Sequence, residues 1–458
     1  MTIDLIVFIN AIILFLFVCL TMGSFLLFLT SISEVVSTFK TYEITDVNSL
    51  IDLSILPSVT IIMSAFNEGS AIRESIMSIL NSLYKNVHII IVNDGSTDDM
   101  LSFLISEYAL QTTEMNSLER FKTAKVINYY ISEKYPNITV IDKKHSNVGD
   151  SLNAGLNICR TPLFATVDAD TLLEPDALSK IIFSFLSRPN TVAVGGGVYV
   201  LNACTFKDGK ILSVKMPHKI VAAMQMCEYL RSFMFGRTGW SPFGGALSFA
   251  GAFTLFQTNA VRQAAGFDLE NFAQDFEIIL RLHTYMRQRN KPYNIHFCPN
   301  AIAWTDVPDT LRGFWGQRER WMRGMLKSTL PYKRMFFNAS YKLQGYFSYP
   351  YYLLFEVFGG LIEFSAYLVF LISWAVGFIH FNSVMLYIIS AWGFMVFLTI
   401  GNAFLFLFNF NRYQQLADPS RLFILVFIET FGFRQFHVLA RFYGLIIYII
   451  HRIQGKKI

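Results

Sequence analysis

Two clusters of polar side chains in this 458-residue sequence have residue types and spacing that suit phosphate chemistry. Asp168 and Asp170 are one residue apart, so their carboxylates can hold one Mg²⁺ or Mn²⁺ ion that bridges a diphosphate. In the run 317–321, arginine offers fork-shaped donors to phosphate and Trp321 offers a flat face to a sugar ring. Simpler readings are solvated turn aspartates for the first cluster and a basic amphipathic helix at an anionic membrane surface for the second.

Two further carboxylates have more than one interpretation. Asp94 lies in an Asn-Asp-Gly turn, where it either only shapes the turn or also accepts hydrogen bonds from a base or ribose. Asp275 lies at the start of a predicted helix, where it is either an ordinary first-turn acid or the base that removes a proton from an acceptor hydroxyl. The residues alone leave both questions open.

Alternating strands and helices place these side chains at one edge of a sheet. We predict strands at 59–63, 88–92, 138–142 and 163–167, and helices at 70–83, 151–159 and 176–186. This alternation is typical of a mostly parallel sheet with helices on both faces, in which ligands bind beyond the carboxyl ends of the strands. Asn67, Glu68, Asp94, Asp168 and Asp170 all follow predicted strands. The polar residues 98–135 are expected to form helices inserted at the rim.

The composition is too apolar for an ordinary soluble protein, with 53% hydrophobic residues and a mean hydropathy of +0.41. Residues 5–30 form an apolar run long enough to cross a bilayer, and no Lys or Arg precedes it, so we expect a retained anchor. Further crossings are expected at 361–379 and 384–410. Charges such as Glu429 and Arg434 interrupt the stretch 422–450, which favours a hairpin or an interfacial helix, and 346–358 also looks interfacial.

Basic residues predict a topology. Lys40, Arg412, Arg421 and the tail 452–457 should be cytoplasmic, whereas the connection 378–383 carries no Lys or Arg and should face outwards. The chain then divides into an N-terminal transmembrane anchor (1–40), a cytoplasmic α/β domain (41–340), and C-terminal transmembrane and interfacial helices (341–458) of a multi-pass plasma-membrane protein. The net charge of +5 lies largely at these membrane flanks and does not indicate nucleic-acid binding. The five cysteines contain no CxxC pair, which supports neither a zinc site nor a disulfide framework.

The order of these motifs resembles that of processive family 2 glycosyltransferases, a group that includes cellulose, chitin, hyaluronan and poly-N-acetylglucosamine synthases. The resemblance covers roughly 57–330 and rests on residues 64–68, 92–96, 147–153, 168–170, 274–275 and 317–321, followed by membrane helices. It implies a Rossmann-like GT-A fold, a UDP-sugar donor, a divalent metal and inversion at the anomeric carbon. It also implies, in many members, a channel that exports the polymer.

The resemblance also implies residue roles. Asp275 matches the Asp of the family's Thr-Glu-Asp base motif, and Gln317 and Trp321 would shape the acceptor site. The implied donor-binding residues are Asn67, Glu68, Asp94, Asp168 and Arg320, and the implied metal ligands are Asp168 and Asp170.

Three positions depart from the family pattern. Gln274 replaces the usual Glu before the base, and Ala250 stands where related sequences tend to have Ser. Val148 stands where a lysine commonly approaches the diphosphate, which removes a charge-assisted contact worth about 1.5–3 kcal/mol unless Lys143 or Lys144 replaces it.

These features predict a hexosyl- or N-acetylhexosaminyl-transferase in the membrane. It would polymerise sugar from a UDP-sugar onto a glycan acceptor to give an extracellular β-linked polysaccharide. The alternatives are transfer of a single sugar to a lipid carrier or glycolipid, and a non-catalytic subunit of a polysaccharide secretion complex, which Gln274 and Val148 motivate. Three or four crossings are few for enclosing a glycan, so we expect a homo-oligomer or a secretion partner beside the lipid bilayer.

Overall fold

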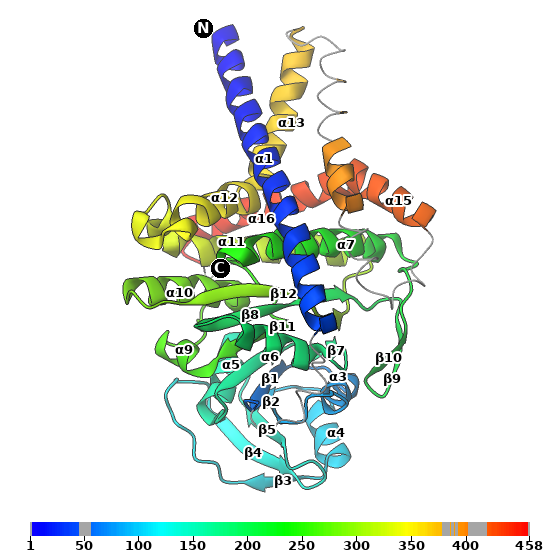
Figure 1. The fold of residues 1–458 in the computed structure, drawn as a ribbon, viewed down its shortest axis with the longest axis vertical. Helices are drawn as coiled ribbons and strands as arrows, with labels where there is room; N and C mark the ends of the chain where they lie inside the picture. The colour runs from blue at the N-terminus through cyan, green and yellow to red at the C-terminus, as the bar shows by residue number, and fades with distance from the viewer. Residues whose placement is uncertain are drawn as a thin grey trace. The chain divides into compact units, whose positions relative to one another are not determined.

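The computed structural model describes residues 2–44, 56–377, 385, 389, 393–401 and 419–456. The chain forms two compact units, coloured along the sequence in Figure 1 and treated separately below. The α/β unit comprises Val36–Val214 and Ser241–Asp306, and the helical unit comprises Met1–Val35, Lys215–Trp240 and Val307–Ile458. Residues 215–240 and 307–340, which the predicted cytoplasmic domain included, cluster with the helical unit.

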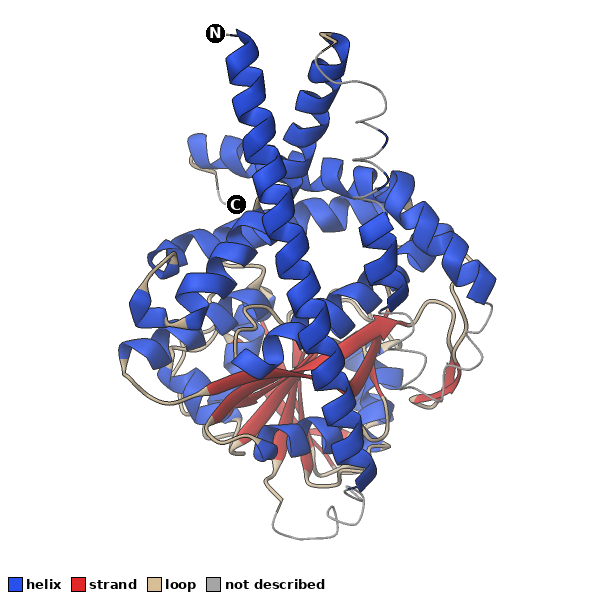
Figure 2. Ribbon diagram, turned by 45° about the horizontal axis from the view of Figure 1, so that its top comes forward, coloured by secondary structure: helices blue, strands red, loops and turns tan. Residues whose placement is uncertain are grey.

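A ten-stranded mixed sheet forms the core of the described α/β unit (Figure 2). Its order is β3-β4-β5-β2-β1-β6-β11-β8-β12-β7. The strands are β1 (Val59–Ala65), β2 (Val87–Asn93), β3 (Leu110–Thr113), β4 (Val126–Ser132), β5 (Ile138–Lys143), β6 (Leu163–Val167), β7 (Leu172–Leu173), β8 (Thr191–Val200), β11 (Phe253–Gln257) and β12 (Asn294–Thr305). A separate two-stranded hairpin contains β9 (Thr205–Lys207) and β10 (Lys210–Ser213).

The predicted parallel arrangement is present in the centre of the sheet and again between β8 and β12. Strands β5, β2, β1 and β6 are parallel to one another. Strand β11 runs antiparallel to both β6 and β8, and the β3–β4 hairpin runs antiparallel to β5. The α/β fold is therefore confirmed. The sheet is mixed, because it combines these parallel pairings with antiparallel ones. The sequence signal was strongest in the central strands because they are buried on both faces, as the five buried residues of β6 show.

Helices pack against this sheet. Helix α5 packs on β1 and β2, and α6 packs on β8 and β12. Each predicted helix is present with shifted ends. The helices of this unit are α3 (Ile72–Leu80), α4 (Met100–Glu107), α5 (Val148–Ile158), α6 (Ala177–Ser187), α9 (Thr258–Gln263) and α10 (Gln274–Gln288), with a 3₁₀ turn at Ser241–Phe243.

The prediction of rim helices at 98–135 is wrong in its second half. After α4 the chain forms β3 and β4, an antiparallel hairpin at the edge of the sheet. Edge strands expose one face to water, so they contain many polar residues, and this polarity suggested a helical insertion. Within β4, Tyr130 and Ser132 are buried while Ile127 and Asn128 are exposed.

The three consecutive glycines at 195–197 lie in β8, where neighbouring side chains pack directly against the backbone. A Cβ added at Gly195 would lie 2.5 Å from the Phe249 ring, and one at Gly196 would lie 2.3 Å from the Phe253 ring. Close packing inside the protein, rather than approach of a substrate, therefore explains these glycines.

Two clusters of buried hydrophobic residues lie within the described part of the helical unit. One contains Met322, Leu326, Val357, Leu445 and Tyr448, and the other contains Leu27, Phe28, Phe235 and Leu398. Its α-helices are α1 (Thr2–Ile44, whose end belongs to the other unit), α7 (Ile220–Leu230), α8 (Thr238–Trp240), α11 (Leu311–Thr329), α12 (Tyr349–Tyr351), α13 (Gly359–Ala375), α15 (Pro419–Ile428) and α16 (Arg434–Ile453). Its π-helical and 3₁₀ segments are Arg231–Arg237, Leu330–Met335, Ala339–Tyr341, Gln344–Ser348, Tyr352–Val357 and Glu429–Phe433.

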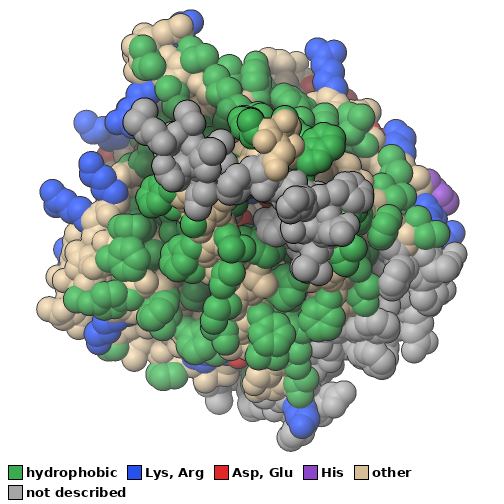
Figure 3. Space-filling model, turned by 90° about the horizontal axis from the view of Figure 1, so that it is seen from above, with side chains coloured by type: hydrophobic (Ala, Val, Ile, Leu, Met, Phe, Trp, Pro, Cys, Tyr) green, Lys and Arg blue, Asp and Glu red, His purple; other side chains and the backbone are tan. Residues whose placement is uncertain are grey.

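Two of the described helices, Phe8–Thr38 and Ile424–Ile453, are long and apolar enough to cross a membrane. The pair Gln344–Val357 and Gly359–Ala375, bent by 55°, would be a third crossing if it forms one span. Helices α1 and α13 lie side by side and are joined by a hydrogen bond from Asn10 Nδ2 to Ser373 Oγ of 3.1 Å. Hydrophobic side chains gather on this unit's surface (Figure 3), among them Phe15, which is 66% exposed, and Trp374, which is 56% exposed. The predicted anchor at 5–30 falls within α1.

Some predictions lie outside the described residues. The crossing predicted at 384–410 is described only at 385, 389 and 393–401. The connection at 378–383, Arg412 and Lys457 are likewise outside.

The charged stretch 422–450 is broken, and two of its charged residues, Glu429 and Arg434, form ion pairs. Helical geometry is interrupted at Phe431 and Gly432, between α15 and α16. Glu429 forms a buried bidentate ion pair with Arg231, with both N–O distances at 2.8 Å. Arg434 pairs in the same way with Glu363 of α13, at 2.9 Å. Such pairing allows charges to lie within an otherwise apolar helical unit.

Candidate active site

Carboxylates collect at the C-terminal edge of the central strands. Strand β1 lies between β2 and β6 in a parallel arrangement, so the residues that follow β1 and β6 emerge at the same edge. Glu68 follows β1, and Asp168 and Asp170 follow β6. Together with Asp275 they form what we call the acidic cleft.

Three carboxylates of the acidic cleft, those of Glu68, Asp168 and Asp170, have no cationic partner among the described residues. Desolvation inside the cleft, followed by the charges of Asp170, Asp275 and Glu68, raises the pKa of Asp168 to about 7 although solvent still reaches its carboxylate. Desolvation also raises the pKa of Glu68, with smaller contributions from Asp170 and Asp98. Within the described residues, no Lys or Arg forms an ion pair with Glu68, Asp168 or Asp170.

Asp170 is partly compensated by neutral donors. Desolvation raises its pKa, whereas hydrogen bonds from the hydroxyls of Thr305 and Thr171 lower it. Both hydroxyl donors lie 3.3 Å from Asp170 Oδ1. The cleft therefore orients this carboxylate without cancelling its charge.

Asp275 joins the cleft from the first turn of α10. The Gly251 amide donates to Asp275 Oδ2 at 3.0 Å, and the Phe276 amide donates to Oδ1 at 2.9 Å. A side chain at position 251 would crowd this contact, because an added Cβ would lie 3.3 Å from the Asp275 Cβ. Asp275, Asp168, Gly251 and Gln274 line one small pocket, in which the Gln274 Oε1 atom is buried without a hydrogen-bond partner.

The acidic cleft has the donors that a divalent cation prefers. The described residues contain no group of three or more His, Cys, Asp or Glu side chains arranged to enclose a metal ion. Mg²⁺ is commonly bound by one or two carboxylates and completes its shell with substrate phosphates and water. The unneutralised pair Asp168 and Asp170 fits that kind of open site.

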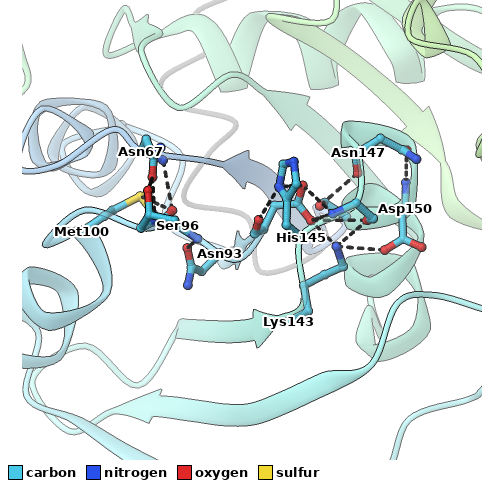
Figure 4. Close-up of polar contacts among 12 residues, drawn as sticks. Asn67, Asn93, Ser96, Met100, Lys143, His145, Asn147 and Asp150 are labelled. Atoms are coloured by element: carbon cyan, nitrogen blue, oxygen red, sulfur yellow. Dashed lines mark hydrogen bonds and ion pairs between the residues drawn. The ribbon is translucent and has the colours of Figure 1, made fainter.

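A second cluster at the same edge has its charges satisfied (Figure 4). We call it the lysine cluster. Lys143, at the end of β5, is fully buried, and its ammonium contacts Asp94 Oδ1 and lies 2.9 Å from Asp150 Oδ1. The Ser146 amide also donates to both oxygens of Asp94, at 3.1 and 3.2 Å. The exposed imidazole of His145 lies 3.2 Å from Asp94 Oδ2.

The lysine cluster changes two expectations. Lys143 does not take the place of the lysine missing at 148, because its ammonium is committed to Asp94 and Asp150. Lys144 is exposed, and Val148 lines the pocket that contains Asp168. Asp94 was identified from the sequence but its partner Lys143 was missed, because nothing in the sequence around this lysine indicates that its side chain is buried.

Asn67 links the loop that follows β1 to the loop that follows β2. It adopts a left-handed conformation with φ of 58°. Its amide N–H donates to Ser96 Oγ at 3.0 Å, and its side-chain oxygen accepts from the Thr97 amide at 2.8 Å. Its Oδ1 atom is therefore already used within the protein.

The predicted residues Gln317, Arg320 and Trp321 lie on α11 in the helical unit. Arg320 is exposed, Trp321 is 41% exposed, and the Gln317 Oε1 atom is buried without a hydrogen-bond partner.

The expectation that Arg318 belongs to a lipid-facing basic surface is wrong. Arg318 is 1% exposed, and its Nη2 donates to Glu228 at 2.7 Å. Its guanidinium carbon lies 4.2 Å from the centre of the Trp321 ring and 4.7 Å from that of Phe314. Helical spacing alone could have placed Arg318 four residues from Phe314, but it could not reveal the partner on α7.

Carboxylates at the carboxyl edge of a buried α/β sheet are typical of enzymes that bind a metal-chelated phosphate. The family described as Glycosyl transferase family group 2 matches residues 163–410, more than half of the chain, and Glycosyl transferase family 2 matches residues 60–111. The chain belongs to glycosyltransferase family group 2. The resemblance predicted from the motif order is thus confirmed.

Curated relatives give a narrower comparison. A poly-beta-1,6-N-acetyl-D-glucosamine synthase of Staphylococcus aureus is 26% identical over 274 residues, which are 60% of this chain and 56% of the relative. The corresponding synthase of Staphylococcus epidermidis is 25% identical over 267 residues, 58% of this chain and 54% of the relative. The chain thus matches little more than half the length of either relative. A solved mannosyltransferase of Pyrobaculum calidifontis, in complex with GDP-Man and Mn²⁺, aligns with 89% of this chain and 99% of its own at 15% identity and a TM-score of 0.48.

Proposed function

We propose that this chain is an inverting, membrane-bound glycosyltransferase that polymerises a hexose or N-acetylhexosamine from a UDP-sugar into an extracellular β-linked glycan. One observation carries the proposal. Asp168 and Asp275 line one pocket, Asp170 lies near enough to raise the pKa of Asp168, and no Lys or Arg among the described residues forms an ion pair with Asp168 or Asp170. Family membership directs this site towards glycosyl transfer.

The proposed reaction uses the acidic cleft as follows. Asp168 and Asp170 would hold Mg²⁺ or Mn²⁺, which offsets the negative charge that develops on the leaving diphosphate. Asp275 accepts the proton of the acceptor hydroxyl while that oxygen attacks the anomeric carbon. The bond from this carbon to the diphosphate oxygen breaks, UDP leaves from the opposite face, and the configuration inverts.

The backbone contacts of Asp275 suit a base. Each carboxylate oxygen accepts one backbone N–H, from Gly251 or Phe276. A carboxylate has about four lone-pair positions, which is more than these two backbone hydrogen bonds use. These contacts fix the carboxylate in place without providing an opposing positive charge.

The remaining binding roles follow the family resemblance. Asn67, Glu68 and Asp94 are proposed to bind or support the nucleotide. Arg320 is proposed to bind phosphate, and Gln317 and Trp321 are proposed to contact the acceptor sugar. The name of the staphylococcal relatives favours an N-acetylhexosamine donor and a polysaccharide product.

A multi-pass location in the plasma membrane, with the α/β unit in the cytoplasm, is part of the proposal. It is supported by the exposed hydrophobic side chains on α1 and α13 and by the lengths of these helices. A second function, transfer of a single sugar to a lipid-linked acceptor, is favoured by the small number of membrane-length helices among the described residues. Export of a polymer through so few helices would require a homo-oligomer or a secretion partner.

The test is a transfer assay with purified full-length protein, Mg²⁺ or Mn²⁺, and a panel of radiolabelled UDP-sugars, followed by sizing of the product. A high-molecular-weight glycan that disappears in Asp275→Asn supports the polymerase. A small product that partitions into organic solvent supports single transfer. Asp176→Asn is the matched control, because Asp176 also lies beside a helix start but pairs with Lys180 on the surface. Full activity in Asp275→Asn would overturn the assignment of the base.

A further inference from the structure

The α/β unit has a second hollow whose lining is basic. We call it the basic pocket. Three cationic side chains line it, from Arg120, Lys122 and Arg262, and no Asp or Glu is among its lining residues. Phe121, Asn153 and Phe267 form further parts of the wall. The hollow is largely open to solvent and has a cavity volume of about 490 Å³, and small-molecule sites commonly occupy about 300–1,000 Å³.

Two asparagines one helical turn apart on α5 build the walls of this pocket. Asn153 Oδ1 accepts from the Phe267 amide at 2.9 Å, and Asn153 Nδ2 donates to the Phe267 carbonyl at 2.9 Å. Asn157 makes the same pair of bonds with the backbone of Phe121, at 3.0 and 2.8 Å. Both asparagines are buried. The segments that contain Phe121 and Phe267 are therefore each held to α5 by a pair of hydrogen bonds from one asparagine side chain.

These two segments also pack closely against each other. Gly266 has a φ of +70°, and a Cβ added there would lie 2.8 Å from the Phe121 ring and 2.5 Å from Asn153 Oδ1. Glycine is needed at this position both for the backbone conformation and for the close approach of the ring. The contact brings together the two segments that contain Phe121 and Phe267, which both line the pocket.

The cationic side chains have few partners within the protein. Arg120 and Lys122 are exposed and form no side-chain hydrogen bond or ion pair with the described residues. Arg262 donates through Nη2 to the carbonyls of Leu156 and Cys159, near the C-terminus of α5, each at 2.6 Å. Its Nε atom is buried and has no hydrogen-bond partner among the residues that the structure describes.

The electrostatic surroundings agree with this geometry. Burial lowers the pKa of Arg262. Cys159 opposes this shift, and the nearby positive charges of Arg120 and Arg160 make smaller contributions that lower the pKa further. The pocket therefore concentrates positive charge that the protein does not offset, the reverse of the acidic cleft.

We propose that the basic pocket binds a phosphate-bearing anion. Arginine presents planar, paired donors that match phosphate oxygens, and lysine adds a compact charge, so the trio suits a group with two or more negative charges. The pocket is a separate site from the acidic cleft, which has the opposite charge, although Phe267 lines both hollows. The inference does not depend on the proposed glycosyl transfer.

The test measures binding of inorganic pyrophosphate to purified full-length protein by isothermal titration calorimetry. EDTA is present throughout so that no divalent metal can recruit the probe to Asp168 and Asp170. A second arm replaces pyrophosphate with water-soluble dihexanoylphosphatidylglycerol, which represents a lipid headgroup. The variant is Arg120→Gln/Lys122→Gln, and the charge-matched control is Lys85→Gln/Lys291→Gln, whose exposed lysines lie outside the pocket lining.

We expect at least a tenfold loss of affinity in the pocket variant and less than a twofold change in the control, because two charge-assisted contacts are removed. Binding of pyrophosphate with this pattern supports a soluble phosphate ligand, and binding of only the short-chain lipid supports a headgroup ligand. Arg120→Lys/Lys122→Arg should retain binding to within about fivefold, since it keeps both charges. Absence of binding for both probes, or equal losses in the pocket variant and the control, would overturn the proposal.

Discussion

The acidic cleft and the lysine cluster lie at the same edge of the sheet but treat charge in opposite ways. In the acidic cleft, the carboxylates of Asp168 and Asp170 remain without a cationic partner among the described residues. In the lysine cluster, Asp94 and Asp150 share the buried ammonium of Lys143. An aspartate directly after a central strand can therefore either await a ligand or hold the scaffold in place.

The difference has an energetic consequence. A satisfied buried ion pair costs several kcal/mol to break, because the remaining partner is left as an uncompensated charge. Carboxylates that lie close together without a cation repel one another and destabilise the unliganded protein. A ligand that neutralises them restores stability. Substitutions in the two clusters should therefore change stability in opposite directions.

The largest effect is expected from Lys143→Met. The change leaves Asp94 and Asp150 buried without their cation, which should cost about 3–5 kcal/mol and lower Tm by more than about 6 °C. Thermal unfolding of the full-length protein, followed by intrinsic fluorescence, measures the shift. The adjacent exposed Lys144→Met should leave Tm almost unchanged. Similar Tm values for the two variants would mean that the lysine cluster does not support the fold.

Mn²⁺ should stabilise the wild-type protein through the acidic cleft. At a concentration 100 times the dissociation constant, the expected gain is about 2.7 kcal/mol. Asp168→Asn and Asp170→Asn should each remove most of this gain, whereas Asp176→Asn should retain it. Tm measured with and without Mn²⁺ for the four proteins decides the point. Equal stabilisation of all four would place the metal elsewhere.

Without metal, Asp168→Asn should be more stable than the wild type by about 1 kcal/mol, since it removes one of several repelling charges that solvent partly screens. The same substitution is expected to lower glycosyl transfer strongly, as happens when a functional site stores unfavourable charge. The comparison requires EDTA in the unfolding buffer. A lower Tm for Asp168→Asn would show that this carboxylate stabilises the unliganded fold.

The smallest effect concerns pH. Because the pKa of Asp168 is raised to about 7 from a normal value near 4, the folded protein binds a proton that the unfolded chain releases between these values. Its contribution to stability is therefore greatest at low pH and is lost as the pH rises through about 7. Metal-free Tm should fall by less in Asp168→Asn than in the wild type between pH 5.5 and pH 8. Identical pH profiles would contradict the raised pKa.

The same contrast separates what the sequence determined from what required the tertiary structure. Strand β6, the positions of Asp168 and Asp275, and the apolar α1 could be predicted because each depends on a local pattern: a short buried run, a residue at the end of an element, or a long hydrophobic stretch. The family resemblance then added roles that no local pattern provides. The antiparallel pairing of β11 and the β3–β4 edge hairpin could not be predicted, since strand polarity depends on where distant segments meet.

Partners of charged side chains were decided only by the tertiary structure. Lys143 lies 49 positions from Asp94, and Arg318 lies 90 positions from Glu228, so neither pairing leaves a signal in the nearby sequence. The amide pairs that Asn153 and Asn157 form with Phe267 and Phe121 also depend on three segments folding together. A charged or polar residue type states what a side chain can bind. Whether the side chain bonds to other residues of the protein or is available to a ligand depends on its burial and on the neighbours that the folded chain places beside it.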